Sequence, residues 1–170
     1  MGIINLMLES PEETVGSLLR QYGWHLAVAE SCTGGLVSHR ITNVPGSSDY
    51  FLGGITAYAN EVKMRLLGVS RETLETCGAV SRETALEMAQ GVRLALQADV
   101  GLGITGIAGP GGGTPQKPVG LVWIALSTDR MSDAKRFLWS GDRLQVKEQS
   151  AQAALEWLVE FLHQPEVASH

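Results

Sequence analysis

The stretch AESCTGG, residues 29–35, places a carboxylate, two hydroxyls and a thiol directly before a pair of glycines. It follows WHLAVA, an apolar run that predicts a buried strand. Two interpretations fit these residues. Either Ser31 or Thr33 caps the next helix while Gly34 and Gly35 give the turn room, or these groups hold a small anionic ligand. Glu30 is likewise either a helix cap or an acid that faces a cation.

A second stretch, TGIAGPGGG, follows another predicted strand and includes Gly106, Gly109 and Gly111. Glycines let backbone N–H groups turn toward an anion, so a phosphate cradle is one interpretation and a flexible connection is the other. No Gly-Lys-Ser/Thr follows and the next element is predicted as a strand, which excludes a Walker loop and a dinucleotide-binding fingerprint. Thr105, at the end of the preceding strand, favours a site.

Ser48, in GSSDY, and Lys63, further along the chain, are the residue types of a serine nucleophile and its base. A desolvated lysine can remove the serine proton as a neutral amine. The alternative is a turn serine and a lysine on a solvated helix face. Tyr58 either orients the lysine or packs in the core, and Arg143 is either a phosphate clamp or a surface arginine.

The four histidines and two cysteines have no metal-ligand spacing, so no metal site is expected. The two cysteines indicate reduced thiols and a cytoplasmic protein. The net charge of −5 gives no basic surface for nucleic acid or an anionic membrane. No apolar run is long enough to span a bilayer, and the first residues do not resemble a secretion signal.

The helices and strands that must position these residues alternate along the chain. Strands are expected over residues 24–30, 49–59, 99–106, 119–129 and 133–140, and helices over 10–23, 34–44, 60–68, 70–78, 81–98 and 142–163. This alternation predicts a largely parallel sheet covered on both faces, and the late hairpin makes the sheet mixed. We expect one α/β domain over residues 1–170, with its core at 10–162 and a polar tail at 163–170. Ligands bind such sheets at the carboxyl ends of strands.

The motifs AESCTGGLVSHRIT, VPGSSDYFLGGITAYANEVKMRLLGV, GAVSRETALEMAQGVR and GITGIAGPGGGTPQKPVGLVWIAL together resemble the CinA C-terminal domain family of competence/damage-inducible proteins. The family includes stand-alone nicotinamide-nucleotide amidases. The resemblance implies a three-layer α/β/α domain, often a homodimer, that hydrolyses nicotinamide mononucleotide to nicotinic acid mononucleotide and ammonia in pyridine nucleotide recycling. It implies no metal or organic cofactor. Longer members have an additional N-terminal domain, whose pyrophosphatase-type activities are not expected here.

Carried over to this sequence, the resemblance implies Ser48 as nucleophile, Lys63 as its base and Tyr58 as a supporting hydroxyl. Ser31 competes with Ser48 for the role of nucleophile. The residues implied in substrate binding are Ser31, Thr33, Gly34, Gly35, Thr105, Gly106, Gly109, Gly111 and Arg143. The alternative function is a non-catalytic module that binds a nucleotide or recognises a protein partner.

Overall fold

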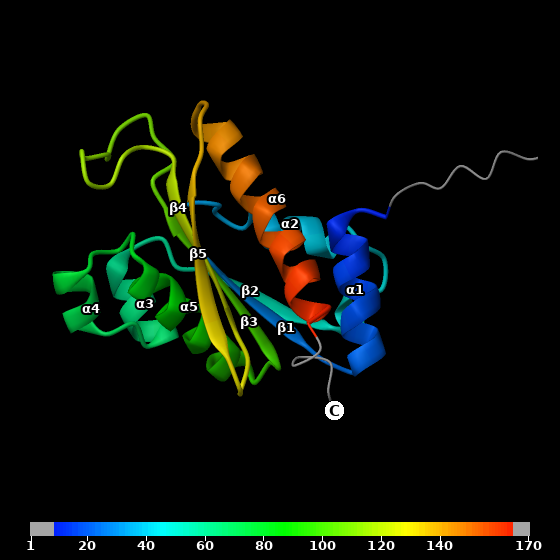
Figure 1. Ribbon diagram of the computed structural model, residues 1–170. Helices are drawn as coiled ribbons and strands as arrows, with labels where there is room; N and C mark the ends of the chain where they lie inside the picture. Colours follow the sequence, from blue (N-terminus) through cyan, green and yellow to red (C-terminus); the bar gives the residue numbers. More distant parts are fainter. Residues whose placement is uncertain (1–8, 165–170) are drawn as a thin grey trace, which may run out of the picture.

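The computed structural model describes residues 9–164, so the predicted tail lies almost entirely outside the described residues. A five-stranded sheet runs through the middle of the molecule, and helices cover both of its faces (Figure 1). In chain order the elements are α1 (Pro11–Tyr22), β1 (Leu26–Glu30), α2 (Leu36–Thr42), the 3-10 helix η1 (Ser47–Asp49), β2 (Phe51–Thr56), α3 (Asn60–Leu67), α4 (Arg71–Thr76), α5 (Arg82–Leu96), β3 (Val100–Gly106), β4 (Leu121–Ser127), β5 (Ser132–Leu138) and α6 (Arg143–Leu162).

The strands lie in the order β2-β1-β3-β4-β5. β1 pairs in parallel with β2 and β3, whereas β4 pairs antiparallel with β3 and β5. The predicted mixed sheet with a late hairpin is thereby confirmed. Because β1, β2 and β3 are parallel, the residues that follow these three strands meet at one edge of the sheet.

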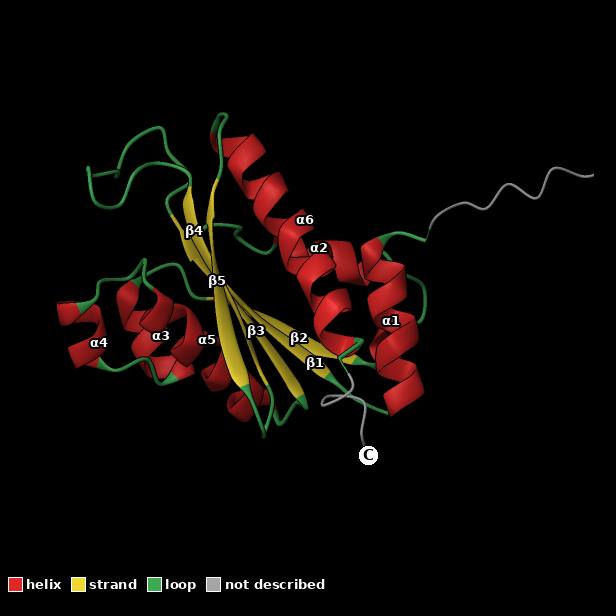
Figure 2. Ribbon diagram, in the orientation of Figure 1, coloured by secondary structure: helices red, strands yellow, loops and turns green. Residues whose placement is uncertain are grey.

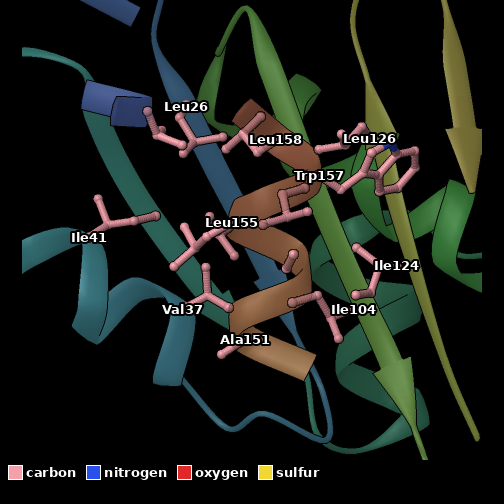
Figure 3. Close-up of a cluster of buried hydrophobic side chains, with 14 of the residues drawn as sticks. Leu26, Val37, Ile41, Ile104, Ile124, Leu126, Ala151, Leu155, Trp157 and Leu158 are labelled. Carbon is pink, nitrogen blue, oxygen red and sulfur yellow. The ribbon is translucent and has the colours of Figure 1, made fainter. Parts of the chain in front are cut away.

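Helices α1, α2 and α6 cover one face of the sheet, and α3, α4 and α5 lie on the other (Figure 2). Figure 3 shows the larger core, where α6 packs on alternate side chains of the central strands. In β1, Leu26 and Val28 belong to this core, whereas Ala27 and Ala29 belong to the smaller core beneath α3 and α5. This alternation is that of a strand buried on both faces, and it confirms the three-layer prediction.

Glycines in β3 bring α5 unusually close to the sheet. A methyl group on Gly103 would lie 2.6 Å from the carbonyl oxygen of Ala85, and one on Gly101 would overlap the carbonyl oxygen of Ala89. Side chains larger than hydrogen would therefore push α5 away from the strand. Since Ala85 lies over Gly103 and Ala89 over Gly101, α5 runs antiparallel to β3 and begins at the strand's carboxyl end.

The helix boundaries follow from local capping. Ser10, Ser70 and Ser81 cap α1, α4 and α5, and each accepts a hydrogen bond from a backbone N–H in the first turn of its helix. Helix α3 begins at Asn60, with Ala59 at the cap position and no side-chain cap. None of the helices within residues 9–164 has the length and apolar character needed to cross a membrane.

Candidate active site

A cavity of about 220 Å³ opens at the edge where the parallel strands end. It is lined by residues from the ends of β1 and β3, from α3, from the segment before α5 and from the start of α6. They are Ser31, Cys32, Tyr58, Asn60, Lys63, Ala79, Val80, Thr105, Gly106, Ala108 and Arg143. The cavity therefore brings together six of the residues predicted from the sequence.

Ser31 and Lys63 form the central contact of this cavity. Lys63 Nζ lies 3.1 Å from Ser31 Oγ, within hydrogen-bonding distance. Ser31 follows β1 directly, and Lys63 lies on α3, which follows the neighbouring strand β2. The parallel pairing of the two strands therefore places a serine hydroxyl against a lysine amine.

Burial of Lys63 makes its amine easier to deprotonate than that of a lysine in solvent. Its side chain is only 1% exposed, and burial lowers the pKa of its amine from the usual value. Nζ also lies 2.8 Å from the carbonyl oxygen of Ala57 and 3.2 Å from that of Tyr58. A neutral amine has two N–H donors and one lone pair. The two carbonyls can accept both N–H bonds of the neutral amine, and its lone pair would then face Ser31 Oγ, in position to take the proton.

Cys32, the other nucleophilic side chain of the cavity, is held in its unreactive form. Burial raises the pKa of its thiol to about 12. The thiolate is the nucleophilic species of cysteine, and a pKa this high leaves almost none of it at neutral pH. The arrangement thus favours the hydroxyl of Ser31 over the adjacent thiol.

Tyr58 and Arg143 meet at the rim of the cavity. The Arg143 guanidinium donates to the hydroxyl of Tyr58 at 2.9 Å and to the carbonyl oxygen of Gly109 at 2.8 Å. The Tyr58 side chain is 63% exposed, and the group that contacts Lys63 is its backbone carbonyl. Tyr58 therefore orients the lysine through its main chain, while its phenol faces the solvent side of the site.

Thr105 and Gly106, at the end of β3, form part of the cavity wall. The buried Thr105 hydroxyl donates to the carbonyl oxygen of Ala79 at 2.7 Å. This bond ties the segment before α5 to the strand and fixes Ala79 and Val80 against the cavity. A methyl group on Gly106 would lie 2.6 Å from Val122, so the close packing of β3 on β4 explains the glycine there.

Glu30 caps α2, which confirms one of its two interpretations. Its buried carboxylate accepts from the backbone N–H groups of Gly35, Val37 and Ser38 at 2.8–3.1 Å, and from the Ser38 hydroxyl at 2.9 Å. These bonds hold the turn that carries Ser31 against the first residues of the helix. Glu30 therefore positions the turn, and the N–H groups it binds are not available to a ligand.

The structure does not bring Ser48 together with Lys63. Ser48 is an exposed residue of η1, which precedes β2, whereas the amine of Lys63 lies against Ala57, which follows β2. The length of a six-residue strand, about 20 Å, separates the two ends. The expected pairing of Ser48 with Lys63 is therefore wrong in its geometry, and Ser31 occupies the place expected for Ser48.

Several predicted binding residues lie outside the cavity wall. They are Thr33, Gly34, Gly35, Gly109 and Gly111. Gly109 contributes a carbonyl oxygen to Arg143, and a methyl group on Gly111 would meet nothing within 4 Å. Five lining residues were not among the predicted site residues, namely Cys32, Asn60, Ala79, Val80 and Ala108. No sequence signal distinguishes Ala79 and Val80 from an ordinary turn.

Residues 8–162 match the model of the CinA C-terminal domain. The chain belongs to the CinA C-terminal domain family. It is 51% identical over 150 residues to a CinA-like protein of Kosmotoga olearia, a match that covers 88% of this chain and 36% of that protein. The chain thus spans about a third of the length of the curated relatives it matches.

Solved structures of the family have the same fold. The competence/damage inducible protein CihA of Agrobacterium tumefaciens is 37% identical, with a TM-score of 0.85 over 95% of this chain and 100% of that one. A CinA superfamily protein of Enterobacter cloacae is 34% identical, with a TM-score of 0.87 over 95% of this chain and 98% of that one. The resemblance noted in the sequence and the predicted fold are therefore both confirmed.

Proposed function

We propose that this domain is an amidohydrolase that converts nicotinamide mononucleotide to nicotinic acid mononucleotide and ammonia. The observation that supports this most is the buried contact between Ser31 and Lys63 at 3.1 Å, in a cavity of a CinA family domain. A carboxamide is a poor electrophile, so its hydrolysis needs an activated nucleophile and a proton for the leaving amine. This pair supplies both.

In the proposed reaction the neutral amine of Lys63 takes the Ser31 proton while Oγ attacks the carboxamide carbon. The resulting ammonium then protonates the departing nitrogen, and the C–N bond breaks to give ammonia and a nicotinoyl ester on Ser31. Water, deprotonated by Lys63, hydrolyses the ester and regenerates the hydroxyl. The Tyr58 hydroxyl oxygen accepts a hydrogen bond from Arg143, so its O–H can still donate, and we assign it as a donor to the developing oxyanion.

The test is ammonia release when the purified protein is incubated with nicotinamide mononucleotide. We expect stoichiometric formation of ammonia and nicotinic acid mononucleotide. Binding of the nucleotide with no ammonia released would overturn the proposal and favour a non-catalytic nucleotide-binding module.

The pH dependence of the reaction should report the protonation of Lys63. Its pKa is lowered by burial from a usual value near 10.5, and only the neutral amine can act as a base. We therefore expect kcat/KM to rise with pH along a limb whose midpoint lies below 10.5. The measurement is a pH–rate profile under conditions where the circular dichroism spectrum is constant. A rate that falls as pH rises through this range would contradict the assignment.

Chelation of metal ions should leave the reaction unchanged. Among residues 9–164, no three His, Cys, Asp or Glu side chains are grouped so that they could hold a metal ion. The proposed steps use only the hydroxyls of Ser31 and Tyr58, the amine of Lys63 and a water molecule. We expect equal ammonia release before and after treatment with EDTA. Activity lost with the chelator and restored by a divalent ion would contradict this.

A further inference from the structure

A nucleotide substrate carries its phosphate at the end opposite the carboxamide, and the glycine-rich segment does not surround the cavity as a phosphate cradle would. Gly109 directs its carbonyl oxygen, a group that repels phosphate, toward Arg143. Gly111, Gly112 and Gly113 are exposed, and none of them lines the cavity. These glycines therefore present no backbone donor on the cavity wall.

Helix α6 places two cations beside the cavity. Arg143 and Lys147 lie four residues apart, on the same side of the helix. Arg143 lines the cavity. Lys147 extends over the turn that carries Ser31, because a methyl group added to Gly34 would lie 3.6 Å from Lys147 Nζ. Arg143 thus lies at the cavity, and the Lys147 amine lies at the turn that follows Ser31.

The positive charge of these side chains is not neutralised locally. Lys147 forms no ion pair within residues 9–164, and Arg143 donates only to a phenol and a carbonyl oxygen. None of the residues that line the cavity is acidic. In a chain with a net charge of −5, a cationic rim of this kind favours a dianionic group.

We propose that Lys147, beside Arg143, binds the phosphate monoester of the substrate and determines the preference for a nucleotide over its nucleoside. This inference rests on the proposed function, because it assumes that the carboxamide lies at Ser31. With the carboxamide at the buried Ser31–Lys63 contact, the ribose and phosphate extend outward between α6 and residues 31–35. The Lys147 amine lies beside that path, next to Gly34.

The experiment compares Lys147→Gln with the wild-type protein on nicotinamide mononucleotide and nicotinamide riboside. A charge-assisted hydrogen bond to phosphate is a strong contact, and its loss should lower kcat/KM for the nucleotide by about 10- to 100-fold. The riboside has no phosphate, so its kcat/KM should stay at the wild-type value. Lys147→Arg should keep most of the preference. Arg130→Gln, in the turn between β4 and β5 at the opposite end of the sheet, removes the same charge and serves as control.

Two kinetic results would overturn the inference: an unchanged nucleotide-to-riboside ratio in Lys147→Gln, or equal losses on both substrates. If the wild-type protein releases no ammonia from either compound, the proposed function fails and calorimetric binding decides the inference separately. The dissociation constant for nicotinamide mononucleotide should then weaken by about 10- to 100-fold in Lys147→Gln alone. A wild-type protein that does not bind the nucleotide, or a variant that binds it equally well, would reject the phosphate site.

Discussion

Replacement of Ser31 by alanine is expected to lower ammonia release from nicotinamide mononucleotide by a factor of about 10³ or more, the usual effect of deleting a serine nucleophile. The hydroxyl of Ser31 has one side-chain contact, to Lys63 at 3.1 Å. Its loss removes the attacking atom but little of the packing, so the fold and nucleotide binding should survive. The measurement is kcat by an ammonia assay, together with the thermal midpoint and the dissociation constant.

Ser48→Ala is the matched control, because it removes the same atom from an exposed residue outside the cavity. It should retain wild-type turnover. The opposite pattern, with Ser48→Ala inactive and Ser31→Ala active, would return the nucleophile to Ser48 and would require a conformation in which η1 reaches Lys63. Loss of activity in Ser31→Ala accompanied by unfolding would instead indicate a structural role for the hydroxyl.

The second large effect is expected for Lys63→Arg, which keeps the positive charge but removes the base. A guanidinium remains protonated at every accessible pH, so it cannot accept the Ser31 proton. Turnover should fall by about 10²- to 10⁴-fold, the range of a general acid–base contribution. Single-turnover rates on nicotinamide mononucleotide provide the measurement, and Lys63→Met should be equally slow.

Arg65→Lys, the reverse exchange at an exposed position of the same helix, is the control and should behave as wild type. If Lys63→Arg keeps most of the wild-type turnover, then Lys63 acts through its charge alone. The proton of Ser31 must in that case be accepted by another group.

Most of the fold could be predicted from the sequence because its signals are local. The caps Ser10, Ser70 and Ser81 mark helix starts through their own side chains, and the alternation of elements predicts the parallel pairing. Local signals could not decide whether Glu30 caps a helix or faces a cation. The answer depends on which N–H groups the turn brings to the carboxylate.

The place of the candidate site was predictable where residues lie at the end of a parallel strand or after it. Ser31 and Lys63 follow such strands and Thr105 lies at the end of one, so the sheet gathers them at one edge. Ser48 comes before its strand, so the order of residues alone already separates it from Lys63. Arg143 was a candidate from its residue type, but it reaches this edge, as Lys147 does, through the packing of α6 on the sheet, which no local pattern encodes.

Burial of Lys63 also links the free energy of unfolding to pH. Its pKa is lowered in the folded state and returns to the usual value near 10.5 when the chain unfolds. Between those two values the unfolded chain binds more protons than the folded one, so the free energy of unfolding rises with pH across that window. Below the lower value both states hold the proton, and the buried charge exerts its full destabilising effect. The amine that would make the site reactive therefore weakens the fold most at pH values below its own folded-state pKa.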